Sequence, residues 1–186
     1  MFIQTEATPN PATLKFIPGR TVLGEGTAEF RAKSEANASP LATRLFGVDG
    51  VTGVFLGSDF ISVTKNDGDE WQHIKPAILG AIMDHYISGA PALMSEHGAE
   101  AAAAEDYDPE DVDTVNTIKE LLDTRVRPAV ANDGGDIVFH GYKDGVVFLH
   151  MRGACAGCPS STATLRHGIE NLLRHFCPDV REVRPV

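Results

Sequence analysis

Between Gly89 and Glu110 the composition of the chain shifts to glycine, alanine, proline and acidic residues, with an unbroken run of alanine at positions 101–104. A stretch with so little bulky apolar content contributes poorly to a packed core. We therefore expect an acidic, Ala-rich linker over residues 89–109, which as a flexible coil would span roughly 25 Å. This linker divides the 186 residues into units at 1–88 and 110–186, each of which needs its own hydrophobic core.

The first unit is predicted to alternate pairs of strands with helices, in the order ββαββα. Strand-like runs at residues 2–7 and 14–17 are separated by prolines, and a second pair at 51–56 and 60–64 is joined by a glycine-containing turn. Ser39-Pro40 starts the first helix as an N-cap followed by proline. An apolar stripe at helical spacing predicts the second helix: Trp71, Ile74, Ile78 and Ile82. Since no metal or catalytic constellation is found in this unit, we expect it to bind a partner or position the second unit.

The second unit is predicted to have the order αββαβ. Its first helix opens at Asp108-Pro109 and carries an apolar stripe to Val126, after which Pro128 interrupts or ends it. Two β-rich runs then form a hairpin through Lys143-Asp144-Gly145, and a helix and a last strand at 180–186 follow. The chain is therefore expected to be an α+β protein built of two small two-layer domains.

The charge of the chain limits its partners. With 16 basic and 26 acidic residues the formal net charge is −10, which disfavours nucleic acid and anionic membranes as partners. No apolar run approaches the roughly 20 residues that span a bilayer. The first residues read as a strand rather than a leader, and three cysteines suit a reducing compartment. We therefore expect a cytoplasmic protein of bacterial type, with a processed organellar form as the alternative.

Two of the three cysteines lie close together in the stretch 153–161, which reads Gly-Ala-Cys-Ala-Gly-Cys-Pro-Ser-Ser. This stretch follows a predicted strand and precedes a predicted helix, so Cys155 and Cys158 are expected in a loop at a helix N-terminus. Unpaired N–H groups and the helix dipole favour negative charge there. We therefore expect a lowered cysteine pKa and thiolates that can ligate a metal.

A single Cys-x-x-Cys motif is compatible with a dithiol redox site, a zinc site or an iron–sulfur site. A thioredoxin-like site is expected inside a βαβ pattern, whereas here a hairpin leads into the loop. A structural zinc site takes four ligands, for which His150 and His167 are the nearest additions. Both histidines are more typical of surface or core positions. Cys177 follows a helix about 24 Å long, so it is expected to be an ordinary buried thiol rather than a third ligand.

Two thiolates per chain do not complete a cubane cluster, which normally takes four. The count points to a cluster shared by two chains, and such a bridging site is labile because separating the protomers exposes it. This is the behaviour of a carrier rather than of an enzyme.

The residues resemble the NifU-like (Nfu) family of iron–sulfur cluster carriers. In the second unit the resemblance is carried by Arg127-Pro128, Asp133-Gly134-Gly135-Asp136, the stretch 153–161, Thr164-Leu165, Gly168-Ile169-Glu170 and Leu172-Leu173. The first unit is similar to the N-terminal domain of many Nfu proteins through Thr8-Pro9-Asn10-Pro11, Leu14-Lys15-Phe16, Ser39-Pro40-Leu41-Ala42, Leu45-Phe46 and the run at 59–65.

The resemblance implies that Cys155 and Cys158 hold a [4Fe-4S] cluster that bridges a homodimer. It also implies transfer to apo iron–sulfur client proteins and exchange with upstream assembly factors. Two rivals stay open: a thiol-disulfide oxidoreductase or persulfide carrier that uses the same pair, and a zinc-stabilised interaction module. Arg152 is expected either to offset cluster charge or to be an exposed strand-end residue. The loop 133–136 is expected to set the entry to the hairpin rather than to bind metal.

Overall fold

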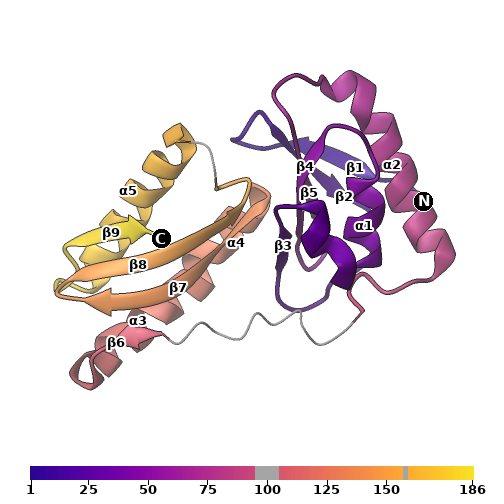
Figure 1. Cartoon of the computed structure of the whole chain (residues 1–186). Helices are drawn as coiled ribbons and strands as arrows, with labels where there is room; N and C mark the ends of the chain where they lie inside the picture. Colours follow the sequence, from indigo (N-terminus) through magenta and orange to yellow (C-terminus); the bar gives the residue numbers. More distant parts are fainter. Residues whose placement is uncertain (95–104, 157–158) are drawn as a thin grey trace. The chain divides into compact units, whose positions relative to one another are not determined.

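Two units, Met1–Glu100 and Ala101–Val186, make up the chain, and each has its own hydrophobic core (Figure 1). The computed structural model describes residues 1–94, 105–156 and 159–186, with side chains of the last segment from Thr162 onward. Helices and strands occur in both units, so the predicted α+β class is confirmed. No helix in these segments is long and apolar enough to cross a membrane.

The first unit contains an antiparallel five-stranded sheet in the order β1-β2-β5-β4-β3. Its strands are β1 (Gln4–Ala7), β2 (Thr13–Ile17), β3 (Ala28–Phe30), β4 (Val51–Leu56) and β5 (Ile61–Lys65). Its helices are the 3-10 helix η1 (Lys33–Ala38), α1 (Pro40–Phe46) and α2 (Trp71–Ser88). The predicted ββαββα order is present, with the three-residue strand β3 and the short η1 in addition.

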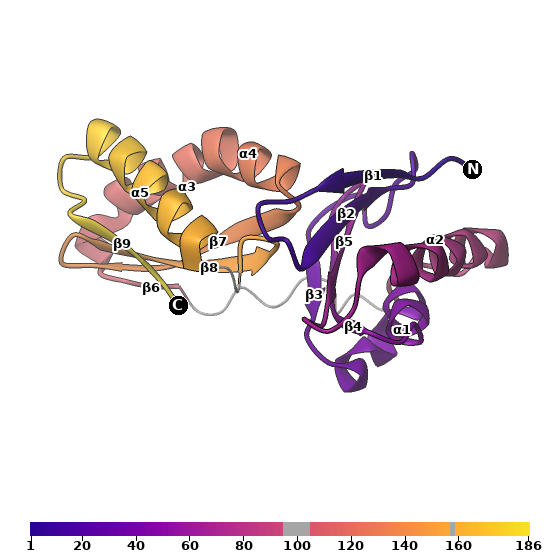
Figure 2. The ribbon, with the colours of Figure 1, turned by 90° about the horizontal axis from the view of Figure 1, so that it is seen from above.

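The two predicted helices of this unit begin and pack as their sequences indicate. The Ser39 hydroxyl accepts a hydrogen bond from the Ala42 N–H at 3.0 Å, and Pro40 occupies the first turn of α1. Ile74, Ile78 and Ile82 face the core from α2. Both helices cover one face of the sheet, so the unit has two layers (Figure 2).

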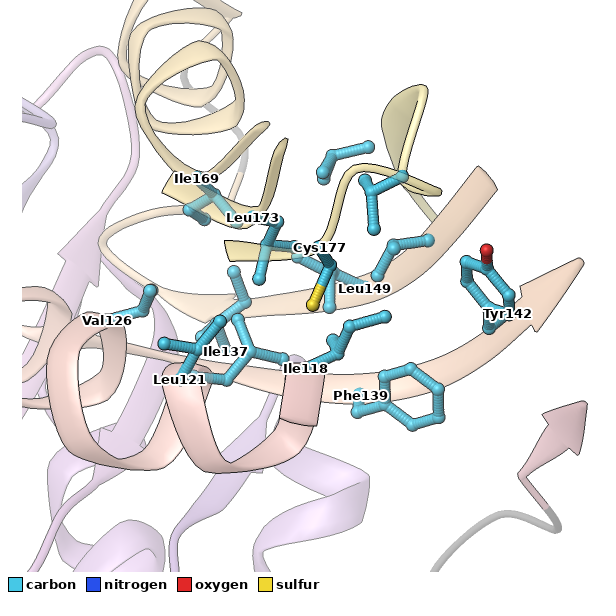
Figure 3. Packing of buried hydrophobic residues seen from close by; sticks show 14 of the residues in the cluster. Ile118, Leu121, Val126, Ile137, Phe139, Tyr142, Leu149, Ile169, Leu173 and Cys177 are labelled. Carbon is cyan, nitrogen blue, oxygen red and sulfur yellow. The ribbon is translucent and has the colours of Figure 1, made fainter. Parts of the chain in front are cut away.

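The second unit contains a four-stranded sheet in the order β6-β7-β8-β9. Its strands are β6 (Asp106–Tyr107), β7 (Gly135–Lys143), β8 (Val146–Gly153) and β9 (Glu182–Pro185). Its helical segments are the 3-10 turn η3 (Pro109–Asp111), α3 (Val112–Leu121), the π-helical turn η4 (Leu122–Val126), α4 (Arg127–Asn132) and α5 (Pro159–Phe176). The helices lie on one face of the sheet, and the core fills the space between them (Figures 2 and 3).

The predicted interruption at Pro128 takes the form of a π-helical turn. Residues 122–126 are π-helical, and Pro128, which has no N–H to donate, lies two residues further on in the first turn of α4. The hairpin between β7 and β8 turns through Asp144 and Gly145, both with positive φ, and pairs Lys143 with Val146. Such a two-residue turn with positive φ at both positions suits an Asp-Gly pair.

One prediction about the sheet is wrong. β8 and β9 pair in parallel, and α5 is the crossover between them, so the cysteine loop does lie inside a βαβ unit. The parallel partner could not be inferred from the hairpin that precedes the loop. The topology of this unit therefore does not disfavour a thioredoxin-like site.

The described ends of the predicted linker 89–109 belong to the two units, whereas residues 95–104 lie outside the described residues. Ser39 donates a hydrogen bond to the Ala92 carbonyl, and the Met94 N–H donates to Ala38 at 2.8 Å. Asp106 and Tyr107 form β6, and Glu105 makes an ion pair with Lys119. The chain on both sides of the undescribed segment thus extends each unit beyond the predicted limits 1–88 and 110–186. These limits stay a prediction.

Candidate metal centre

Cys155 lies between the end of β8 and the start of α5. Its side chain belongs to the core of the second unit and is only 6% exposed. Cys158, the predicted second ligand, lies outside the described residues, so its closeness to Cys155 stays a prediction. The described half of the site is therefore a buried thiol in a loop at a helix N-terminus.

Hydrogen bonds hold the backbone around Cys155 to two neighbouring elements. The Ala154 N–H donates to the Gly134 carbonyl at 3.2 Å, which ties the loop to the turn before β7. The Thr162 hydroxyl donates to the Cys155 carbonyl at 2.9 Å, which ties it to the first turn of α5. Gly153 has a φ of +65°, a conformation that favours glycine, and so lets the strand turn into the loop.

Gly135 packs closely against the Cys155 thiol. It pairs with Gly153 across the hairpin. A Cβ atom at position 135 would lie 2.7 Å from Cys155 Sγ and 2.7 Å from the Arg152 carbonyl oxygen. Real Cβ atoms do not approach other atoms so closely. The absence of a side chain at this position therefore leaves the space that the thiol occupies.

A bidentate ion pair joins α4 to the first residues of β7. Arg127 Nε donates to Asp136 Oδ1 at 3.0 Å, and Arg127 Nη2 donates to Asp136 Oδ2 at 2.9 Å. Asp136 is 4% exposed and follows Gly135 directly. The pKa of Arg127 is raised, chiefly by the hydrogen bonds to Asp136. Sequence reasoning missed this pair, although the Arg-Pro and Asp-Gly-Gly-Asp motifs that carry the resemblance contain both partners.

The electrostatic expectation for the cysteine loop is wrong for Cys155. Burial raises the pKa of the Cys155 thiol to about 12, and the carboxylates of Asp133 and Asp136 contribute in the same direction. A position near a helix N-terminus lowers a thiol pKa only where the thiol is solvated enough to ionise. In the metal-free chain Cys155 is therefore a neutral thiol at physiological pH.

The other candidate ligands do not gather around Cys155 in the described part of the chain. His150 Nδ1 lies 3.1 Å from the carbonyl oxygen of Val186, and His167 is exposed on α5. Cys177 is buried in the core between α5 and the sheet, as predicted (Figure 3). Among the described residues, no group of three or more His, Cys, Asp or Glu side chains could hold a metal ion.

Comparison with known families identifies both units. Residues 3–89 match the family described as "Scaffold protein Nfu/NifU N terminal", and residues 118–184 match the family described as "NifU-like domain". Together these matches cover most of the chain, including the loop that holds Cys155. The chain belongs to the NifU-like (Nfu) family, which confirms the resemblance inferred from the motifs.

Curated relatives resemble the chain over its whole length. A Drosophila erecta protein named "NFU1 iron-sulfur cluster scaffold homolog, mitochondrial" is 51% identical over all of this chain and 65% of its own length. An Arabidopsis thaliana protein named "NifU-like protein 4, mitochondrial" is 50% identical over 98% of this chain and 65% of its own. The chain thus spans about two thirds of these relatives.

Solved structures show a weaker likeness. The solution structure of a NifU-like protein from Saccharomyces cerevisiae covers 52% of this chain and 87% of that protein at 27% identity, with a TM-score of 0.47.

Proposed function

We propose that the chain is a non-enzymatic iron–sulfur cluster scaffold or carrier. It binds a labile [4Fe-4S] cluster between two copies of itself and passes the cluster to apo-proteins. Membership of the Nfu family and the names of relatives that are called iron–sulfur cluster scaffolds support this proposal. The cluster is cargo in this reading, and the protein supplies the thiols and the surroundings that hold it.

Cys155 and Cys158 of each copy are the proposed ligands. The observation that carries the assignment is the position of Cys155: its sulfur lies against Gly135, in a space that no side chain at that position could share. Soft thiolate ligands suit iron–sulfur clusters, whereas the neighbouring carboxylates of Asp133 and Asp136 do not. Since a cubane takes about four thiolates and the motif supplies two, a second copy completes the set.

Because the Cys155 thiol is neutral before it binds, the affinity of the protein for a cluster depends on pH. Cluster binding must displace the proton from Cys155, because only the thiolate ligates iron. The free energy of that deprotonation is subtracted from the free energy of binding. A cluster bound in this way is held less tightly than one bound by preformed thiolates, which suits a protein that gives its cluster away.

Anaerobic reconstitution tests the proposal. We expect absorption and Mössbauer spectra of a [4Fe-4S] cluster, about four irons per two chains, and a doubling of the mass in solution on loading. Cys155→Ser and Cys158→Ser should abolish the cluster, whereas Cys177→Ser, which changes the third cysteine of the chain, should leave it in place. A Cys155→Ser chain that still held a full cluster would refute the ligand assignment.

A dithiol or persulfide carrier is the second candidate, and the βαβ setting of the loop favours it. The raised pKa of Cys155 opposes it, since the thiolate is the nucleophile in these reactions. Insulin reduction by a chain that purifies without iron would support this rival. Zinc in place of iron in anaerobically purified protein would support a zinc-stabilised interaction module instead.

The first unit is proposed to bind or position a partner, such as an apo client or an upstream assembly factor. A chain lacking residues 1–88 should take up the same cluster but transfer it to an apo-protein more slowly. An unchanged transfer rate would refute this role. The relatives named above are called mitochondrial, and a cytoplasmic location of bacterial type stays a prediction for this chain. Fractionation of cells that produce the full-length protein would decide between them.

A further inference from the structure

The ion pair between Arg127 and Asp136 lies next to the candidate metal centre. A small movement of the paired residues would therefore shift the surroundings of Cys155. The Asp136 side chain is 6% exposed, and the residue before it is Gly135, which packs closely against the Cys155 thiol. Burying a carboxylate is costly even when it is paired, so a buried pair is weak evidence for net stability. Fixing one conformation is a better-attested role for such a pair.

We propose that the Arg127–Asp136 pair is a positioning device for Cys155, which holds Gly135 beneath the thiol before a cluster arrives and so sets how long the cluster is retained. The second half of this inference rests on the proposed function, because retention means retention of the cluster. Neither residue contacts the cluster in this proposal, since both act through the strand that carries Gly135.

The contacts on the helical side show how the pair is anchored. Arg127 is the residue at which the π-helical turn ends, and its N–H donates to the Leu122 carbonyl. Its guanidinium also contacts Asp123 at 3.3 Å, so the side chain is held from its own helix as well as from β7. A π-helical turn is rare and is often found at functional sites. Here it places Arg127 where the guanidinium meets Asp136.

The contacts on the strand side show how a displacement would be transmitted. Asp136 lies opposite Arg152 in the hairpin. The Arg152 carbonyl oxygen is one of the two atoms that would lie 2.7 Å from a Cβ atom on Gly135, and the Cys155 sulfur is the other. Close packing without free space passes on small shifts rather than absorbing them. A movement of β7 at Asp136 would therefore change the space available to the Cys155 thiol.

The two parallel hydrogen bonds need the planar fork of an arginine. A lysine at position 127 would keep the charge, but it would offer a single point donor on a flexible stem. Arg127→Lys is therefore the variant that removes the geometry and keeps the charge. Arg174→Lys is the matched control, because Arg174 pairs with Glu170 at 3.4 Å on the surface of α5 in the same unit.

The test measures the alkylation of individual cysteines in the metal-free chain. In a Cys158→Ser background, peptide mass spectrometry reads Cys155 and Cys177 separately. We expect Arg127→Lys to raise the alkylation rate of Cys155 about tenfold. This corresponds to a free energy of local opening that is lower by about 1.4 kcal/mol. The Cys177 rate should stay constant, and Arg174→Lys should change neither rate.

Two outcomes would overturn the proposal. An unchanged Cys155 rate in a folded Arg127→Lys chain would show that the pair does not position the thiol. Equal acceleration at Cys155 and Cys177 would show that the pair only stabilises the unit as a whole. With Cys158 restored, a reconstituted Arg127→Lys chain should lose its cluster to a chelator several times faster, with an unchanged absorption spectrum. If the wild-type chain takes up no cluster, the proposed function fails, but the alkylation result still decides the positioning role.

Discussion

At the scale of single residues, the Cys155 thiol is governed by burial more than by its place at a helix N-terminus. Its pKa of about 12 results first from desolvation and then from the charges of Asp133 and Asp136. Nothing in the spacing of Cys155 and Cys158 reveals this, because the motif alone does not say how deeply a thiol is buried. The thiol is consequently protected from reaction until a metal competes for its proton.

The raised pKa of Cys155 predicts a loss of stability in alkaline solution. Between about pH 9 and pH 12 the thiol of the unfolded chain loses its proton while the folded chain keeps it, so the stability contributed below pH 9 is lost as pH rises. The loss is up to about 4 kcal/mol for a shift of this size. Urea unfolding of the metal-free chain at pH 8 to 11 should show a steeper decline for the wild type than for Cys155→Ser. Parallel declines would contradict the prediction.

Gly135→Ala should damage the candidate metal centre directly. The new methyl group would meet the Cys155 sulfur and the Arg152 carbonyl oxygen at 2.7 Å, so the hairpin or the loop must shift. Overpacking of this kind costs about 1–3 kcal/mol, and cluster uptake should fall with it. Urea unfolding and the iron content after reconstitution measure the two effects.

Gly168→Ala is the control for Gly135→Ala, because a Cβ atom at this position of α5 has no neighbour within 4 Å. It should leave cluster uptake unchanged and stabilise the helix by up to about 1 kcal/mol. If both variants behaved alike, the close approach at Gly135 would be irrelevant to the site.

At the scale of elements, periodicity and turn chemistry predicted the main helices and both hairpins. The short elements were not predicted, because their formation depends on pairing rather than on sequence pattern. Three-residue β3 forms against β4, and β6 forms against the bulged part of β7, where a Cβ atom on Gly141 would lie 2.7 Å from the Asp106 carbonyl oxygen. The Arg127–Asp136 pair was missed for a similar reason, since its partners lie nine positions apart, one in α4 and the other in β7, and only the fold brings them together.

The start of α1 gives a prediction at this scale. Ser39 is fully buried, accepts the Ala42 N–H and donates to the Ala92 carbonyl, so it joins α1 to the chain that follows α2. Ser39→Ala should destabilise the first unit by about 1–2 kcal/mol, because it removes the cap and leaves the partly buried Ala92 carbonyl without this donor. Ser34→Ala, at an exposed position of η1, is the control. Equal unfolding free energies for the two variants would refute the role of Ser39.

At the scale of the whole molecule, the chain is two separately cored units whose stabilities can be measured apart. Trp71 is the only tryptophan in the sequence and lies in α2 of the first unit, where its indole N–H donates to the Pro11 carbonyl at 3.1 Å. Cys177 lies in the core of the second unit. Tryptophan fluorescence therefore reports unfolding of the first unit, and trapping of the Cys177 thiol reports unfolding of the second.

This separation allows a test of the buried histidine of the first unit. His85 is 2% exposed, and its Nδ1 has no hydrogen-bond partner among the residues that the structure describes. Burial lowers the pKa of His85, and the charge of Arg44 lowers it further. Because the folded chain resists protonation, the stability that His85 contributes is present above its usual pKa near 6.5 and is lost as pH falls through the lower folded value.

Acidification from pH 7.5 to pH 5 should therefore lower the urea midpoint of Trp71 fluorescence more than the midpoint of Cys177 trapping. The glutamine in His85→Gln cannot gain a proton, so the urea midpoint of Trp71 fluorescence should depend less on pH in this variant. His73→Gln, at an exposed position of the same helix, should behave as the wild type. If His85→Gln lost as much stability in acid as the wild type, another group would be responsible. If both midpoints fell together, the two units would unfold as one.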